Sequence, residues 1–223
     1  MTVYDIRNLS KVYNHRKEPV FALRDVTWKV EPGSFTAITG PSGSGKTTLL
    51  LSLGGLIQPS SGELHYGDLD LYRLPASRLA EFRNRSIGFV LQTFNLVPYL
   101  SALENVMLPM IAPGRRGSDP ADRATSLLGD LGLSDRMDFL PRELSVGQQQ
   151  RVAIARALAN DPDVILADEP TGNLDPALSD EILNILEKLN AEQGKTIVMV
   201  THSPRAAGRA GTALKLAEGR IEA

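Results

Sequence analysis

The sequence predicts an α/β fold with a mainly parallel sheet, and three observations support that prediction. β-prone segments alternate with helical patterns along most of the chain, which is typical of parallel strands linked through helices. The segment 34–39 ends in a glycine-rich turn that leads directly into a helical pattern. The run Val164–Ala167 is apolar throughout, as expected of a central parallel strand that is covered on both faces.

Each expected strand is a short β-prone segment bounded by polar or turn-forming residues. In chain order, the expected strands are 2–8, 22–30, 34–39, 62–66, 87–90, 164–167, 196–200 and 212–216. The stretch 100–160 differs, because it carries helical patterns and no convincing strand. We interpret it as a helical subdomain, with two of its helices over 122–131 and 147–159.

Two helix starts carry recognisable capping signals. Ser101 and Glu104 have capping-box spacing, and Pro109 is expected to end that helix soon after it begins. Asp175 followed by Pro176 has the form of an N-cap with proline at the first helical position. An amphipathic helix that packs on the sheet is therefore expected to begin there.

Composition narrows the class of protein. The 223 residues are 42% hydrophobic and carry a formal net charge of -2, so no nucleic acid is expected as a partner. The absence of cysteine excludes disulfides and thiolate metal sites. The most apolar stretch, 49–57, is interrupted by polar and glycine residues and falls short of the roughly 18 residues that a membrane span needs. With no secretion signal at the N-terminus either, we expect a cytoplasmic protein.

A phosphate-binding pattern follows the third expected strand and consists of Gly40-Pro41-Ser42-Gly43-Ser44-Gly45-Lys46-Thr47. Its glycines let backbone N–H groups turn inward around phosphate oxygens, and the next helix adds the positive end of its dipole. We expect Lys46 to reach the β- and γ-phosphates and the Thr47 hydroxyl to bind Mg²⁺. Ser44 and Thr48 are expected to make secondary phosphate contacts. A chance glycine and serine loop is the alternative, which the flanking strand and helix disfavour.

Two carboxylates, Asp168 and Glu169, follow the apolar run that ends at Ala167. They therefore emerge at the carboxyl end of a parallel strand, where ligands bind in open α/β sheets. Asp168 is expected to hold Mg²⁺, and Glu169 to act as the general base on the water that attacks the γ-phosphate. Alone, two acids after a strand are a weak signal, but the phosphate-binding pattern strengthens it.

The run Leu144-Ser145-Val146-Gly147-Gln148 resembles the signature sequence of ABC ATPases and lies shortly before the acidic strand. The resemblance extends over the whole chain. Tyr13 is similar to the aromatic residue that stacks on adenine, Gln92 to the glutamine that joins core and helical subdomain, and His202 to the switch histidine. The run Asn173-Leu174-Asp175 resembles the D-loop. Each residue alone has a structural explanation, and their occurrence together in family order supports the resemblance.

This resemblance implies a single ABC ATPase domain over 1–223. Its core is RecA-like, a P-loop NTPase with an N-terminal antiparallel β subdomain, formed by 1–92 and 161–223. The helical subdomain, which carries the signature, is inserted as 93–160. The implied activity is hydrolysis of ATP with Mg²⁺, in a dimer where the signature of one subunit faces the P-loop of the other.

Roles in that site follow from the resemblance. Ser145, Gly147 and Gln148 of one subunit would contact ATP bound to the other, from a helix N-terminus, and Asp175 would lie at the same interface. Gln92 would contact the Mg²⁺ and report on the γ-phosphate. His202 would contact that phosphate and hold Glu169 in line.

The signature departs from the family at Val146, where glycine is usual. A β-branched residue avoids a positive φ, so we expect an ordinary backbone conformation there and a working site. The Gln148–Gln150 run is expected to be a solvated helix face.

A second resemblance concerns the branch of the family. The segments 94–98, 103–106, 108–109 and 171–175 are similar to those of lipoprotein-releasing, macrolide-exporting and cell-division ABC ATPases. That implies a separate membrane permease, export or transmembrane mechanical work driven by dimer closure, and a peripheral position on the cytoplasmic face of the membrane. A set of apolar residues in this region is the expected docking surface for that permease. The alternative is that these residues form the subdomain's own core, and we expect them to serve both as core and as docking surface, with 94–99 the more exposed part. They are Phe94, Leu96, Val97, Tyr99, Leu103, Met107 and Met110.

Two alternatives belong to other classes. One is a soluble ABC ATPase acting in DNA repair or on ribosomes, although the coiled-coil, zinc-binding or tandem additions usual there are not seen. The other is a P-loop kinase or GTPase, which the signature and His202 disfavour.

Overall fold

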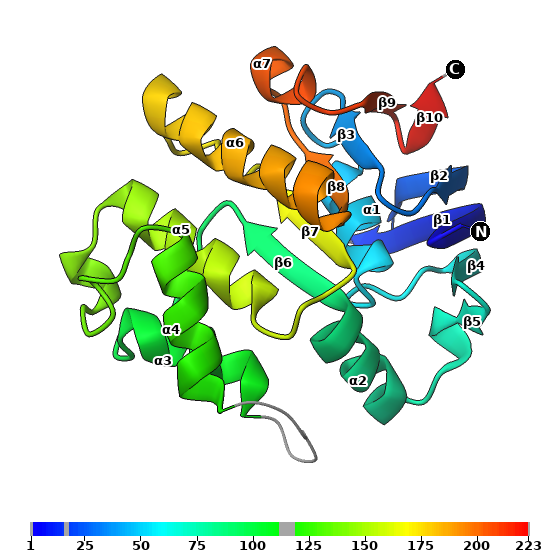
Figure 1. Cartoon of the computed structure of the whole chain (residues 1–223). Helices are drawn as coiled ribbons and strands as arrows, with labels where there is room; N and C mark the ends of the chain where they lie inside the picture. Colours follow the sequence, from blue (N-terminus) through cyan, green and yellow to red (C-terminus); the bar gives the residue numbers. More distant parts are fainter. Residues whose placement is uncertain (1, 16–17, 112–118, 223) are drawn as a thin grey trace.

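Two β-sheets with a helix between them form the body of the molecule (Figure 1). The computed structural model describes residues 2–15, 18–111 and 119–222. The larger sheet has the strand order β10-β9-β3-β8-β7-β6, in which every pairing is parallel except that of β10 with β9. Its strands are β3 (Phe35–Thr39), β6 (Ile87–Leu91), β7 (Val164–Asp168), β8 (Thr196–Val200), β9 (Thr212–Ala217) and β10 (Arg220–Glu222). The predicted α/β fold is confirmed.

The central strands of this sheet are buried on both faces. Along β7, the side chains of Ile165 and Ala167 belong to one core cluster, and Val164 and Leu166 belong to the other. This alternation arises because successive side chains of a strand point to opposite faces. It explains why the strand reads as a continuous apolar run.

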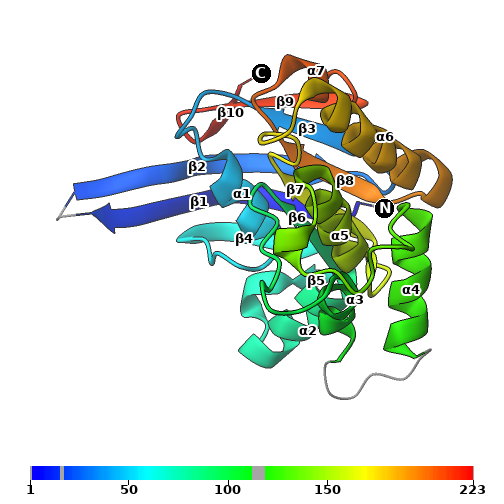
Figure 2. The ribbon, with the colours of Figure 1, turned by 90° about the vertical axis from the view of Figure 1, so that its left-hand side faces the viewer.

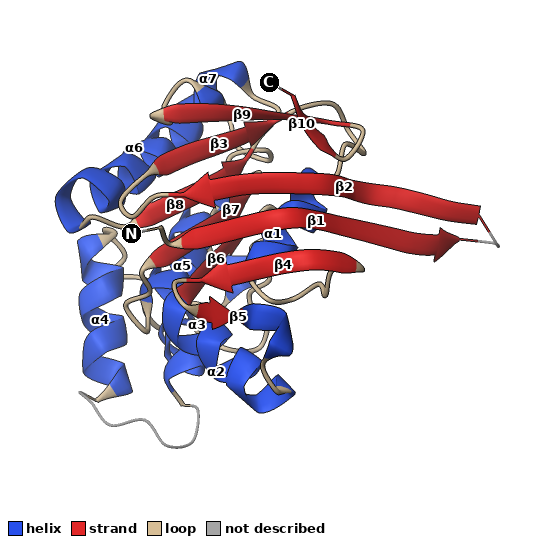
Figure 3. Ribbon diagram, turned by 90° about the vertical axis from the view of Figure 1, so that its right-hand side faces the viewer, coloured by secondary structure: helices blue, strands red, loops and turns tan. Residues whose placement is uncertain are grey.

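The smaller sheet is antiparallel and has the order β2-β1-β4-β5. Its strands are β1 (Tyr4–His15), β2 (Glu18–Val30), β4 (Ser61–Tyr66) and β5 (Leu69–Asp70). Beyond the sheet, β1 and β2 continue as a two-stranded ribbon that extends away from the body (Figures 2 and 3). Both strands are longer than predicted, because the outer part of the ribbon is defined by cross-strand pairing rather than by an apolar alternation.

Helix α1 (Lys46–Leu53) lies between the two sheets. Its Leu49, Leu50 and Leu53 share a core cluster with residues from both of them. The Tyr4 hydroxyl of β1 also donates a hydrogen bond to the Leu53 carbonyl, at 3.0 Å. Helix α1, which follows the glycine-rich turn, is therefore held by both sheets.

The other face of the larger sheet is covered by helices α3 to α6 (Figure 1), whereas α2 contributes Phe82 to the core cluster that contains α1. The described part of the chain contains α2 (Ala76–Ser86), α3 (Ala102–Met107), α4 (Pro120–Asp130), α5 (Val146–Leu158), α6 (Pro176–Gln193) and α7 (Pro204–Ala207). Three short 3₁₀ turns accompany them, at Leu71–Arg73, Leu108–Met110 and Pro141–Glu143. The strands β5 and β10 and the helices α2 and α7 are absent from the sequence prediction.

The predicted capping signals are present in the structure. Ser101 and Glu104 form a capping box at α3, and the helix gives way to a 3₁₀ turn that contains Pro109. Asp175 caps α6 and accepts hydrogen bonds from the backbone N–H groups of Ala177 and Leu178. No helix among the described residues combines the length and the apolar character needed to cross a membrane.

Candidate active site

The turn between β3 and α1 forms a cradle whose glycines cannot be replaced without strain. Gly40 and Gly45 have φ values of 142° and 101°, a region that side chains rarely occupy. A Cβ at Gly45 would lie 2.1 Å from the Ala22 carbonyl oxygen, and one at Gly40 would lie 2.0 Å from that of Leu216. These glycines therefore allow the loop to pack directly against backbone of β2 and β9.

Two polar side chains of this cradle are available for an anion. The Lys46 ammonium donates to the carbonyls of Gly40 and Pro41, at 2.9 and 2.8 Å, so it is held inside the loop. The Ser44 hydroxyl is buried and has no hydrogen-bond partner among the described residues. A buried hydroxyl without a partner is costly, and a phosphate oxygen at the cradle would satisfy it. The dipole of α1 favours the same charge at this end of the helix.

A hydroxyl and a carboxylate meet beside the cradle. The Thr47 hydroxyl donates to Asp168 Oδ1, at 3.2 Å, across the end of β7. Burial raises the pKa of the Asp168 carboxyl, the Glu169 charge raises it further, and the Thr47 hydrogen bond and the Lys46 charge oppose the shift. The Thr47 hydroxyl and the Asp168 carboxylate are oxygen ligands of the kind that Mg²⁺ prefers, and the cation would stabilise the ionised carboxylate.

Glu169 and His202 lie together at the carboxyl ends of β7 and β8. The imidazole Nδ1 of His202 is 2.8 Å from Glu169 Oε1, and the His202 backbone N–H donates to Oε2 at 3.3 Å. Glu169 has a positive φ of 47°, held by its N–H bond to the Val200 carbonyl, at 2.9 Å. Such backbone strain persists only where the surroundings enforce it, and it is concentrated at functional sites.

Gln92 follows β6 and is exposed. Its backbone carbonyl accepts a hydrogen bond from the Asn173 side chain, at 3.1 Å. A Cβ at Gly172 would lie 3.1 Å from the amide Nε2 of Gln92, so this side chain lies against the loop that follows Glu169. The structure thus brings Gln92 into the same neighbourhood as the two carboxylates.

The signature residues are located at the N-terminus of α5. The Ser145 hydroxyl and the Gln148 side chain form a capping box, with bonds of 3.3 and 2.9 Å. Val146 is the first helical residue, is 44% exposed and does not have a positive φ, so the expected ordinary conformation is confirmed. Gly147 is buried, and a Cβ there would lie 2.8 Å from Leu178 Cδ2 of α6.

The prediction of a solvated face over Gln148–Gln150 is wrong for Gln150. This side chain is fully buried, and its amide nitrogen donates to the Pro170 carbonyl at 2.9 Å. The reason is the position of α5, which presents this side to the loop directly after Glu169. Because glutamine is normally a surface residue, the sequence carries no local signal for that contact.

Tyr13 lies on β1 and is paired with Val20 of β2, two residues from Ala22, whose carbonyl borders the cradle at Gly45. The residue is 40% exposed, and the Lys11 ammonium lies 5.0 Å from its ring centroid. Among the residues that the structure describes, the side chains of Tyr13, Ser145 and Gln148 form no hydrogen bond with the cradle.

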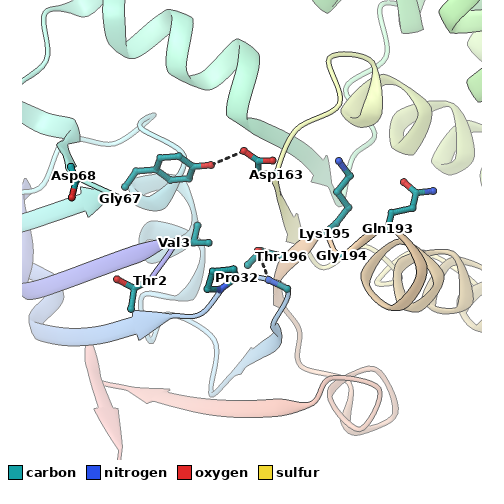
Figure 4. Close-up of a pocket in the computed structure, with 12 residues that line it drawn as sticks. Thr2, Val3, Pro32, Gly67, Asp68, Asp163, Gln193, Gly194, Lys195 and Thr196 are labelled. Carbon is teal, nitrogen blue, oxygen red and sulfur yellow. Dashed lines mark hydrogen bonds between the residues drawn. The ribbon is translucent and has the colours of Figure 1, made fainter.

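A pocket of 530 Å³ lies elsewhere (Figure 4). Asp163, Lys195 and Thr196 line it at the amino ends of β7 and β8, whereas Asp168 marks the carboxyl end of the same sheet. None of the predicted site residues lines this pocket. The predicted site residues gather at the opposite, carboxyl end of the sheet strands.

Comparison with known proteins agrees with this geometry. The sequence profile of the family described as ABC transporter matches residues 23–172. A lipoprotein-releasing system ATP-binding protein, LolD of Syntrophus aciditrophicus, is 46% identical over 97% of this chain and 97% of its own length. A macrolide export ATP-binding/permease protein, MacB of Syntrophobacter fumaroxidans, is 46% identical over 100% of this chain, which spans only 31% of that longer protein.

A solved dimeric ATP-binding cassette, in a post-hydrolysis state with ADP and Pi, is similar in structure. It has a TM-score of 0.91 and 42% identity, with 99% of this chain and 97% of that chain covered. The family match, the full-length relatives and this structural likeness together show that the chain belongs to the ABC transporter family and is an ATP-binding, ATP-hydrolysing cassette of it.

Proposed function

We propose that two copies of this ATPase close on each other around two ATP molecules, and that this closure drives a separate membrane permease. The observation that supports the proposal is that two pairs of side chains in contact lie beside the phosphate cradle. Thr47 touches Asp168, and Glu169 touches His202, all at the carboxyl edge of the larger sheet. That edge offers a phosphate site, a cation site and a base within one neighbourhood.

In this proposal Lys46 and Ser44 bind the phosphates, with Thr48 as a further contact, and Tyr13 stacks on the adenine. The oxygens of Thr47, Asp168 and Gln92 would hold Mg²⁺, which when bound would neutralise charge on the β- and γ-phosphates. Tyr13 would reach the nucleotide from the projecting ribbon, where its partly exposed ring could stack on a base.

Hydrolysis is then a transfer of the γ-phosphoryl group to water. Glu169 accepts a proton from the attacking water while the oxygen of that water bonds to the γ-phosphorus. The bond between the γ-phosphorus and the oxygen that bridges it to the β-phosphate breaks, which gives ADP and phosphate. His202 fixes the orientation of the carboxylate and faces the γ-phosphate. The backbone N–H of the same residue holds the second carboxylate oxygen.

The signature would act on ATP bound to the other subunit. Ser145 and Gly147 lie at the N-terminus of a 13-residue helix, which favours an anion, and Gln148 and Asp175 would flank the interface. The helical stretch 93–160 would move relative to the core, 1–92 and 161–223, as the dimer closes. The dimeric form of the related solved cassette supports this arrangement.

A groove on the surface supplies a docking site for the permease. It has a volume of 360 Å³ and is lined by Leu56, Ala80, Arg83, Asn84, Ile87, Gly88, Phe89, Leu91, Pro109, Arg156, Ala157 and Asn160. The segment 94–99 borders it, because Arg156 also bonds the Phe94 and Asn95 carbonyls. Tyr99 of this segment is 77% exposed.

The residues expected to serve both as core and as docking surface differ in burial. Met110 is buried in the core cluster, and Leu96, Leu103 and Met107 pack partly against the same cluster. Those side chains hold the helical part together, as apolar positions of short helices commonly do. The proposed contact is therefore the groove with Phe94–Tyr99.

The relatives place the chain in the lipoprotein-releasing and macrolide-export branch, so we propose export or transmembrane mechanical work, at the cytoplasmic face of the membrane. The names of these relatives also disfavour the repair and ribosome alternative, since they are components of transporters.

The test is to express tagged Glu169→Gln in the native host, solubilise membranes with ATP, and identify what co-purifies. An integral-membrane protein is expected, and Glu169→Gln with the further change Leu56→Glu in the groove should lose it. Recovery of only soluble proteins, or of the same membrane protein with both variants, contradicts the permease role.

A further inference from the structure

The turn after Gln92 contains two consecutive non-glycine residues with left-handed backbone. Phe94 has φ 52° and Asn95 has φ 48°. Asparagine tolerates this region, but for a bulky residue such as phenylalanine it is an outlier. The turn must therefore be held by contacts outside it.

Arg156 of α5 supplies those contacts. Its Nη2 donates to the Phe94 carbonyl and its Nη1 to the Asn95 carbonyl, each at 2.6 Å. Bonds this short are typical of charge-assisted pairs, and the guanidinium fork is suited to two neighbouring acceptors.

The guanidinium has no acidic partner in the part of the chain that the structure describes. Burial lowers the pKa of Arg156, and no neighbouring charge contributes to that shift. The positive charge is therefore balanced mainly by the two carbonyl dipoles of the turn. If residues 94 and 95 left this conformation, the guanidinium would lose both acceptors, and the free-energy cost of burying its charge would rise.

The turn lies between two parts of the proposed site. Gln92 precedes it by two residues, and the backbone of Gln92 is bonded on its other side to Asn173. Arg156 belongs to the helix that begins at the signature. One side chain thus connects the signature helix to the segment that positions Gln92.

We propose that Arg156 is a positioning residue for ATP hydrolysis, which holds the Phe94–Asn95 turn in its left-handed conformation and so fixes Gln92 relative to the signature helix. This inference depends on the proposed role of Gln92 in hydrolysis. Arg156 does not touch nucleotide in this account, and its effect passes through the turn.

Arg156→Gln is expected to lower kcat by about tenfold, the scale of backbone strain at one or two residues, with the Kd for ATP unchanged. Exchange of the amide hydrogens over 92–97 should become faster. Because glycine adopts the left-handed region without help, the same substitution in a Phe94→Gly, Asn95→Gly background should lower kcat by less than about threefold.

Arg151→Gln is the matched control. Arg151 lies on the same helix and donates to one backbone carbonyl of the helical part, that of Leu131, at 3.2 Å. It does not bond the turn, so kcat should stay within about twofold and exchange over 92–97 should not change. Arg156→Lys, which keeps the charge but loses the fork, replaces Arg156→Gln if the latter does not fold, and kcat should again fall.

An equal loss of kcat in both backgrounds, or equal losses for Arg151→Gln and Arg156→Gln, would overturn the inference. Gln92→Ala separates this from failure of the proposed function. If Gln92→Ala lowers kcat and the Arg156 variants do not, only the positioning role fails. If Gln92→Ala leaves kcat unchanged, the proposed role of Gln92 fails, and the positioning role fails with it.

Discussion

Both carboxylate oxygens of Glu169 are held by one residue, His202. The imidazole lies 2.8 Å from Oε1, and the backbone N–H of His202 reaches Oε2 at 3.3 Å. The Glu169 side chain is only 15% exposed, whereas that of His202 is 69% exposed. The proposed base is thus kept in place by the turn between β8 and α7, and the histidine side chain remains exposed.

Glu169→Gln is expected to lower kcat by about 10²- to 10⁴-fold, because an amide cannot accept the proton of the attacking water. Binding of ATP should be retained, since Glu169 is not part of the phosphate cradle.

Lys46→Ala is the opposite case and should lose ATP affinity, because it removes the ammonium of the cradle. Steady-state hydrolysis and a nucleotide titration check both variants. Hydrolysis at the wild-type rate by Glu169→Gln would remove Glu169 as the base.

Gly45→Ala should destabilise the fold by about 1–3 kcal/mol or more, because strain at a positive φ is joined by a clash with backbone. Gly43 is the matched control. It also has a positive φ, 78°, but a Cβ there would meet nothing within 4 Å. Gly43→Ala should therefore lose only about 1 kcal/mol. Denaturant unfolding without nucleotide measures both, and equal losses would show that the close approach to Ala22 is unimportant.

Asp168→Asn should stabilise the nucleotide-free protein at pH 7. Burial raises the Asp168 pKa above 3.8, its ordinary value, so the folded state binds the proton more tightly than the unfolded state does. The ionised carboxylate therefore destabilises the fold at neutral pH, and the penalty is lost as pH falls through the folded pKa. The free energy of unfolding of the wild type and of Asp168→Asn should be measured from pH 3 to pH 8. The two curves should converge below pH 3.8.

The same variant should lose the stabilisation that Mg²⁺ and ATP give the wild type, because the proposed cation site then lacks its carboxylate. A thermal shift with and without Mg²⁺ at fixed ATP checks this. If Mg²⁺ and ATP stabilised Asp168→Asn as much as they stabilise the wild type, the assignment of Asp168 as a Mg²⁺ ligand would be contradicted.

Val146→Gly should not accelerate hydrolysis, because Val146 already has helical backbone and glycine relieves no strain. We expect kcat within about twofold of the wild type, and a loss of stability of up to about 1 kcal/mol from the lower helix propensity of glycine. A several-fold rise in kcat would instead indicate that valine hinders the signature in the closed dimer.

The sequence predicts those parts of the site in which a short segment contains both the residues needed for the chemistry and the residues needed for the local fold. Gly40 and Gly45 are needed for the turn itself, and Lys46 follows at the first residue of the helix. Asp168 and Glu169 terminate an apolar strand, so their place at the carboxyl edge follows from the strand. In each case a short segment determines both conformation and chemistry.

Contacts between distant segments leave no such local signal. Gln150 and Arg156 look like ordinary polar residues of an amphipathic helix, and their partners, Pro170 and the 94–95 turn, are known only once α5 is packed. The outer ribbon and the edge strand β10 likewise depend on pairing with a neighbour. Such pairing cannot be derived from propensity alone.

The central claim is that ATP is bound between two copies of the chain. The most direct test is the mass in solution of Glu169→Gln with Mg²⁺ and ATP, with ADP, and with ATP after the further change Ser145→Arg. We predict a dimer with ATP only, and a monomer that still binds ATP when Ser145 is changed. A monomer with ATP bound to Glu169→Gln, or a dimer that is indifferent to nucleotide and to Ser145, would contradict the account.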